Sequence, residues 1–109
     1  MAKGRILTGD RPTGSLHLGH YVGTLANRVQ LQEQYEIFLV VADYHALTRH
    51  TEKDHVIQTQ QHVRDLVLDY LSVGIDPDKT TIYLQSDVPS VSELHLIFSM
   101  IASRSITRC

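Results

Sequence analysis

The most constraining feature of this sequence is an almost unbroken run of β-branched and aromatic side chains at residues 36–42, Glu-Ile-Phe-Leu-Val-Val-Ala. A continuous apolar run of this length is typical of a strand that is buried on both faces of a parallel sheet. Two runs of the same kind lie before and after it, at residues 5–8 and 80–85. The sequence therefore predicts three parallel strands.

Helical periodicity fills the intervals between these runs. Apolar side chains recur close to every 3.6 residues over residues 16–33 and again over residues 54–73. Gly74 follows the second stretch at the position where a left-handed residue ends a helix, and Pro77 prevents the helix from continuing. We therefore expect one helix between each pair of neighbouring strands.

A third helix is expected after Pro89. Ser90 and Glu93 have the spacing of a capping box, which predicts that the helix begins at Ser90. Its expected apolar face consists of Leu94, Ile97, Phe98 and Ile101. The resulting order, β-α-β-α-β-α, predicts an α/β fold that is the amino-terminal half of a doubly wound parallel sheet.

Composition narrows the class of protein. With 109 residues, 42% hydrophobic and 20% charged, the chain is expected to form one compact soluble unit. Its net charge of −2 provides no basic surface for nucleic acid. Cys109 is the single cysteine and closes no internal disulfide, and no apolar stretch has the length of a signal peptide or a membrane span. These features predict a cytoplasmic protein without a membrane partner.

The segment richest in candidate functional residues is Gly-Asp-Arg-Pro-Thr-Gly-Ser-Leu-His-Leu-Gly-His-Tyr-Val-Gly at residues 9–23. It joins the first strand to the first helix, at the carboxyl edge of the sheet where doubly wound folds bind ligands. Glycines there allow backbone to approach a ligand, and the helix amino terminus attracts phosphate. The same residues are also compatible with a simple connecting loop, and the G-x-G-x-x-G and Walker patterns do not occur.

The pair His17 and His20 favours the ligand-binding interpretation. Two histidines three residues apart on the first helical turn would face an anion at that terminus and donate hydrogen bonds to it. Histidines without a role and a zinc site are the alternatives, but zinc needs three or four ligands. The remaining histidines have no recognised zinc spacing: His45, His50, His55, His62 and His95. A nucleotide site accounts for the glycines, the helix start and the histidines together, so no metal site is predicted.

Residues 9–21 resemble the "HIGH" signature of class I aminoacyl-tRNA synthetases, and the Pro-Thr-Gly before it and Tyr-x-Gly after it are similar to the tryptophanyl subclass. Three further segments, residues 42–48, 73–79 and 84–89, resemble the same subclass in the correct order. The resemblance extends from about residue 5 to residue 100 and implies a Rossmann-like catalytic domain.

The resemblance implies a two-step reaction. The tryptophan carboxylate attacks the α-phosphate of ATP, which accompanies Mg²⁺, and tryptophanyl-adenylate and pyrophosphate form. The tryptophanyl group then passes to tRNA(Trp). The resemblance also implies a homodimer.

The same resemblance assigns roles to individual residues. The ATP-binding positions are Arg11, Pro12, Thr13, Gly19 and His20. The catalytic positions, which stabilise the pentavalent α-phosphate, are His17 and His20. The amino-acid pocket positions are Leu7, Gly9, Ala42 and His45. Arg11 stands where bacterial relatives often have glutamine, and the polar residues 43–48 are also compatible with a solvated loop.

The family pattern is incomplete in this sequence. The KMSKS-type lysine loop, the carboxylate that recognises the indole N–H and the anticodon-binding region are not found, and residues 102–109 match the family poorly. We therefore expect residues 1–109 to be a partial catalytic domain without a second domain, a truncated portion that is inactive by itself.

Four other interpretations remain open at this level. The chain could belong to a tyrosyl-type synthetase, or to another HxGH nucleotidyltransferase that adenylylates a small precursor. It could be a non-catalytic fragment that acts as an oligomerising or binding module through an exposed sheet edge. A histidine-rich metal-binding protein has the least support.

Overall fold

The computed structural model describes residues 3–48 and 53–102, so His50 and Cys109 lie outside the described residues. Its centre is a sheet of three parallel strands in the order β1 (Arg5–Asp10), β2 (Glu36–Val41) and β3 (Thr80–Leu84). The predicted α/β fold, the half of a doubly wound sheet, is confirmed.

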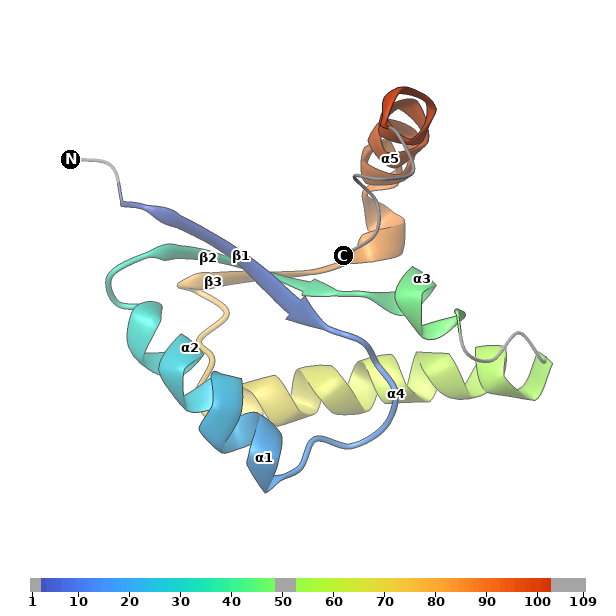
Figure 1. Ribbon diagram of the computed structural model, residues 1–109. Helices are drawn as coiled ribbons and strands as arrows, with labels where there is room; N and C mark the ends of the chain where they lie inside the picture. Colours follow the sequence, from blue (N-terminus) through green and yellow to red (C-terminus); the bar gives the residue numbers. More distant parts are fainter. Residues whose placement is uncertain (1–2, 49–52, 103–109) are drawn as a thin grey trace.

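Helices connect the strands and cover one face of the sheet (Figure 1). The first connection is a continuous helical segment made of α1 (Leu18–His20), the π-helix η1 (Tyr21–Leu25) and α2 (Ala26–Leu31). The second connection contains the short α3 (Asp43–Ala46) and the long α4 (Lys53–Ser72). After β3 come the 3₁₀ turn η2 (Gln85–Asp87) and α5 (Pro89–Ile101).

The π-helical turn η1 interrupts what the sequence predicts as one regular α-helix. The Thr24 hydroxyl donates a hydrogen bond to the His20 carbonyl at 3.1 Å. The Ala26 N–H reaches back five residues to the Tyr21 carbonyl, the π-helical spacing. Side-chain competition for a backbone carbonyl is a local event that apolar periodicity does not report.

The core lies between the sheet and this single layer of helices. Tyr70 and Leu66 of α4 have no exposed area, and they pack with Leu25 against the sheet. The remaining core residues are Ile37, Leu39, Val41 and Ile75. The side chains of β2 that face the helices are therefore fully buried.

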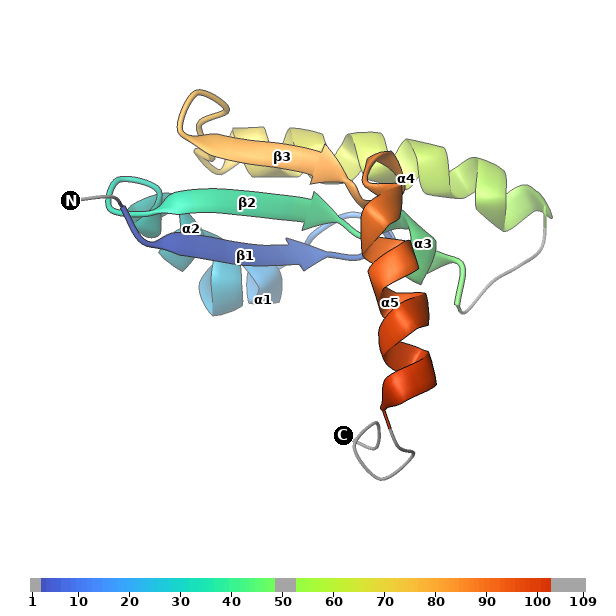
Figure 2. The same cartoon turned by 90° about the horizontal axis from the view of Figure 1, so that it is seen from above.

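The other side of the sheet is open, which makes the expectation of a strand buried on both faces wrong for β2. Phe38 and Val40, which alternate with the core residues, are only partly buried. Leu7 on β1 is 69% exposed. The reason is that α1, α2 and α4 all lie on the other side of the sheet, whereas α5 stands beyond the carboxyl ends of the strands and does not cover them (Figure 2).

The predicted end of α4 is confirmed. Gly74 has a φ of +103°, the left-handed conformation that glycine adopts without strain. The Ile75 N–H donates to the Tyr70 carbonyl at 3.0 Å, and the Gly74 N–H donates to the Leu71 carbonyl at 3.2 Å. These two hydrogen bonds form the Schellman motif that satisfies the last helical carbonyls.

The helix α5 begins at Pro89 rather than at Ser90, and no side chain caps it, so the predicted capping box is wrong. Proline supplies a helical φ and has no N–H to satisfy, so the helix can begin there. The expected apolar face exists but is not buried, since Phe98 is 58% exposed and Ile101 77%. The helix lies on the side of the sheet opposite α4 (Figure 1).

Candidate active site

The loop between β1 and α1 crosses the carboxyl edge of the sheet. It turns sharply at its start, where the Thr13 N–H donates to the Arg11 carbonyl at 2.9 Å. Its end is tied to α4, because the Leu16 N–H donates to the Asp69 carboxylate at 3.0 Å. The loop therefore has a defined path above the sheet.

The two histidines cap the first helical turn with their own side chains. His17 is the residue before α1, and its Nδ1 accepts a hydrogen bond from the Gly19 N–H at 3.1 Å. In return, the Nδ1 of His20 accepts a hydrogen bond from the His17 N–H at 3.3 Å. A neutral imidazole whose Nδ1 accepts carries its proton on Nε2. Both rings are therefore set to donate from Nε2.

Gly19 is required by the position of the His17 ring. A Cβ at Gly19 would lie 2.9 Å from Cε1 of His17 and 3.0 Å from its Nδ1. Real Cβ atoms do not make contacts this short, so any other residue would displace the ring. Gly19 thus allows the ring to cap the helix.

A different steric contact explains why residue 9 is a glycine. A Cβ at Gly9 would overlap the Val40 carbonyl group and come within 2.5 Å of Val40 Cγ1. Gly9 and Val40 are register partners in the β1–β2 pair. The absence of a side chain here lets the two strands close up beside the loop.

The end of β2 supplies the opposite side of the site. Ala42 precedes α3, and His45 lies on that short helix. The Nδ1 of His45 is 2.9 Å from Oε1 of Gln85, a residue of η2. The Asp43 carboxylate accepts a hydrogen bond from the Ser86 N–H at 3.1 Å. These contacts hold the ends of β2 and β3 together and orient His45.

Asp10 is the last residue of β1 and lies within a network of hydrogen bonds. Its Oδ2 accepts from Arg28 Nη1 at 2.5 Å and from the Tyr70 hydroxyl at 2.6 Å. Arg28 Nη2 also donates to the Thr8 hydroxyl at 3.0 Å. Burial alone raises the pKa of Asp10, but the hydrogen bonds from Arg28 and Tyr70, with the charges of Arg28 and His20, hold that pKa below its ordinary value of 3.8.

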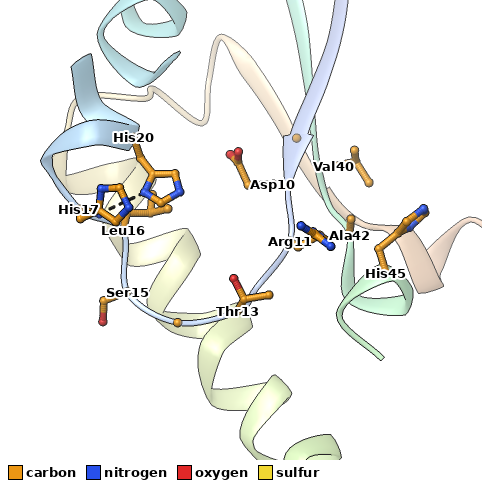
Figure 3. A pocket seen from close by; sticks show the side chains of 12 residues that line it. Asp10, Arg11, Thr13, Ser15, Leu16, His17, His20, Val40, Ala42 and His45 are labelled. Carbon is orange, nitrogen blue, oxygen red and sulfur yellow. Dashed lines mark hydrogen bonds between the residues drawn. The ribbon is translucent and has the colours of Figure 1, made fainter. Parts of the chain in front are cut away.

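These parts enclose one cavity of about 600 Å³. Figure 3 shows His17 and His20 on one side of it and His45 on the other, with Asp10 and Arg11 between them. Seven of the predicted site residues line it: Gly9, Arg11, Thr13, His17, His20, Ala42 and His45. The other lining residues are Asp10, Gly14, Ser15, Leu16 and Val40.

Three predicted site residues lie elsewhere. Leu7 lines a separate apolar hollow of about 580 Å³ on the open face of the sheet, with Phe38 and Tyr83. Pro12 is buried and lines a third hollow, between the loop and α4. Gly19 is not in the cavity wall and acts through the ring of His17.

Sequence reasoning missed four residues that organise this site: Asp10, Arg28, Tyr70 and Gln85. Tyr70 lies within residues 54–73, whose periodicity predicts only an apolar helix face and says nothing of its hydroxyl. An arginine within the predicted first helix had no visible partner, because Asp10 lies eighteen residues earlier. The sequence did contain one signal for Asp10, because it is an acidic residue just after the strand predicted at residues 5–8.

Two absences concern only the described residues. No group of three or more His, Cys, Asp or Glu side chains within residues 3–48 and 53–102 is arranged to hold a metal ion. In the same part of the chain, no helix is both long enough and apolar enough to span a bilayer.

Comparison with known proteins gives consistent matches. The tryptophan–tRNA ligase of Chlamydia caviae is 52% identical over 103 residues, which are 93% of this chain and 30% of that protein. The tryptophan–tRNA ligase of Borreliella burgdorferi is 55% identical over 98 residues, 90% of this chain and 28% of that protein. This chain therefore spans about 30% of the length of these curated relatives.

A solved structure agrees with these matches. The tryptophanyl-tRNA synthetase of Campylobacter jejuni, crystallised with ADP and tryptophan, superimposes with a TM-score of 0.82 at 39% identity. The match covers 93% of this chain and 31% of that one. The family model described as tRNA synthetases class I (W and Y) matches residues 2–108. The resemblance inferred from the signature residues is thus confirmed, and the chain belongs to the class I tRNA synthetases of the W and Y family.

Proposed function

We propose that residues 1–109 form part of the catalytic domain of a tryptophan–tRNA ligase. In the first step the carboxylate of tryptophan attacks the α-phosphate of ATP, the bond to pyrophosphate breaks, and tryptophanyl-adenylate forms. In the second step a tRNA(Trp) hydroxyl takes the tryptophanyl group and AMP leaves. The names of the relatives favour tryptophan over tyrosine.

The observation that carries this proposal is the convergence of three separate segments on one cavity. The end of β1 brings Gly9, the following turn brings His17 and His20, and the end of β2 brings His45. A cavity at the carboxyl edge of a parallel sheet is where doubly wound folds bind nucleotides. Its volume of about 600 Å³ is within the range of small-molecule sites.

The histidines are placed to stabilise the charge that develops during activation. The Nε2–H groups of His17 and His20 remain free of the capping bonds, which use only Nδ1. Negative charge grows on the α-phosphate oxygens as the carboxylate attacks, and donors held in advance lower the barrier. Arg11 and Thr13 would hold the nucleotide from the loop. Pro12 would support the loop on the side that faces α4. Gly19 would contribute by allowing the His17 ring to cap the helix.

The amino-acid pocket is proposed to lie beside the strand ends. Gly9, Ala42 and His45 line the same cavity as the histidines, which would bring the tryptophan carboxylate close to the α-phosphate. Leu7 borders the neighbouring apolar hollow on the open sheet face. An apolar surface of this kind suits an indole ring.

Mg²⁺ is proposed to enter with ATP. Asp10 is the only acidic residue among the described side chains that line the cavity, and both its oxygens face Arg28. A carboxylate engaged in this way is a poor Mg²⁺ ligand, so the phosphates would hold the ion.

Transfer to tRNA(Trp), a homodimer and a cytoplasmic location belong to the same proposal. The homodimer is supported by exposed apolar side chains on α5, including Leu94, Ile97 and Phe98, which are 49%, 52% and 58% exposed. An exposed apolar surface of this extent is typical of protein interfaces. Sedimentation of the purified chain tests it, and a monomer at all concentrations would contradict self-association through this helix.

A chimera tests the function directly. Residues 1–100 of this chain replace the matching segment of the Campylobacter jejuni synthetase, and tryptophan-dependent exchange of pyrophosphate into ATP is measured. We expect exchange well above a chimera that carries His17→Ala. A folded chimera that binds tryptophan and ATP without exchange would contradict the proposal.

The 109-residue chain by itself is a second test. It is expected to bind ATP, since it carries the phosphate-facing residues, and to show little or no exchange. Exchange at a normal synthetase rate would contradict the proposal that these residues form one wall of the site.

A further inference from the structure

Three elements of the fold meet at the Asp10 carboxylate. Asp10 ends β1, Arg28 lies on α2 and Tyr70 lies on α4. The donors are 2.5 Å (Arg28 Nη1) and 2.6 Å (Tyr70 hydroxyl) from the same oxygen, Oδ2. We call these three residues the Asp10 network.

The Asp10 network is buried. Arg28 is 7% exposed and Tyr70 has no exposed area, while the Asp10 side chain is 20% exposed on the side of the cavity. A buried ion pair adds little net stability, because desolvation offsets most of the attraction between the charges. Stability alone therefore does not account for a carboxylate at this position.

The loop that follows Asp10 is anchored a second time to the same turn of α4. The Asp69 carboxylate accepts the Leu16 N–H at 3.0 Å, and Asp69 is the neighbour of Tyr70. Residues 11–15 thus run between two anchor points that belong to adjacent residues of one helix. A shift of either anchor would move Arg11 and Thr13 relative to the histidines.

The charges of the network also suit an anionic ligand. Asp10 lines the same cavity as His17 and His20. A carboxylate without a partner at this point would repel a triphosphate. Arg28 neutralises it, so the carboxylate can fix the backbone of the loop without opposing the phosphates.

We propose that Asp10, held by Arg28 and Tyr70, is a positioning residue that sets the path of the 11–16 loop for ATP. It touches neither substrate in the reaction and acts through the loop. The inference rests on the proposed function, because it takes ATP as the ligand of that loop.

The test uses the 109-residue chain and Tyr70→Phe, which removes one hydroxyl and keeps the ring in the core. Backbone ¹⁵N–¹H spectra report the amides of Thr13 and Leu16, and the same samples are titrated with ATP. We expect changed amide shifts in the loop and ATP binding weakened roughly tenfold, since small displacements of positioned groups have large effects. Far-ultraviolet circular dichroism checks that the fold is retained.

Tyr35→Phe is the matched control. Tyr35 lies at the opposite end of β1, where its ring packs near Gly4. It should alter neither the loop amides nor the ATP affinity. If Tyr70→Phe does not fold, Arg28→Lys replaces it, because lysine keeps the charge and loses the two-pronged contact to Asp10 and Thr8.

The outcomes separate the two proposals. Wild-type chain that does not bind ATP contradicts the proposed function, and the loop amides still test the positioning role. Loop amides of a folded Tyr70→Phe or Arg28→Lys variant that match the Tyr35→Phe control overturn the inference. Unchanged ATP affinity in such a variant overturns it as well.

Discussion

The imidazole rings of His17 and His20 lie in contact but tilted to one another, with centroids 4.0 Å apart and an interplanar angle of 48°. Each ring accepts a backbone N–H through Nδ1, so the pair caps the helix on which it depends. These capping bonds leave Nε2 of each ring available for the hydrogen bonds to phosphate that are proposed above. The capping role thus uses one nitrogen of each ring, and the proposed role in activation would use the other.

His20→Ala in the active chimera should lower the rate of activation far more than the affinity for tryptophan. The proposed donor acts on charge that is present only in the transition state, and loss of one such donor costs about 10²–10³-fold in rate. Pyrophosphate exchange gives the rate, and equilibrium dialysis gives the tryptophan affinity. Equal losses in both measurements would argue against a transition-state role.

Gly9→Ala should destabilise the fold. The added methyl meets the Val40 carbonyl in a paired strand, where backbone on both sides resists movement. The expected loss in the free energy of unfolding is about 1–3 kcal/mol. Urea unfolding measures it.

Gly23→Ala is the control for this substitution, because its Cβ would meet nothing within 4 Å. In a helical segment, alanine is expected to be neutral or to stabilise by about 0.5–1 kcal/mol. Similar losses for both variants would show that the Val40 contact is not the cause.

Acid should weaken the fold partly through Asp10. Its pKa in the folded state is held below the ordinary 3.8, so its contribution to stability is present above that value and is lost as pH falls through the lowered pKa. The free energy of unfolding should therefore decrease from about pH 5 downward. Asp10→Asn should flatten this decrease, whereas Asp78→Asn, at an exposed carboxyl, should leave its slope closer to that of the wild type.

The phenol of Tyr70 should ionise only at high pH, because it is buried. Burial, followed by the hydrogen bond to Asp10 and the Asp10 charge, raises the pKa of Tyr70 far above its ordinary value of 10.0. The neutral phenol stabilises the fold fully below that ordinary value, and this contribution is lost as pH rises through the raised pKa. The phenolate absorbance of Tyr70 at 295 nm should therefore appear only when the chain unfolds. A Tyr70→Phe chain that keeps a late step linked to unfolding would contradict this assignment.

Local patterns in the sequence were sufficient for the order of the elements. Apolar runs at residues 36–42 and 80–85 predicted β2 and β3, and Gly74 predicted the end of α4, because each signal depends on neighbours within a few residues. The glycine-rich loop and its histidines were likewise sufficient to predict a site at the carboxyl edge of the sheet. Seven of the residues that the family resemblance assigns to the site line one cavity at that edge.

Only the tertiary structure decided which of these residues act on one another. Asp10 and Tyr70 are sixty positions apart, and their contact depends on how α4 packs on the sheet. The sequence also did not indicate that one face of the sheet is open, because a continuous apolar strand has the same pattern whether one or both of its faces are covered. The sequence by itself determined the order of the elements and the residues that are candidates for the site. The packing of one helical layer on one face of the sheet determined which of these residues come into contact, because such contacts arise only when distant segments are brought together.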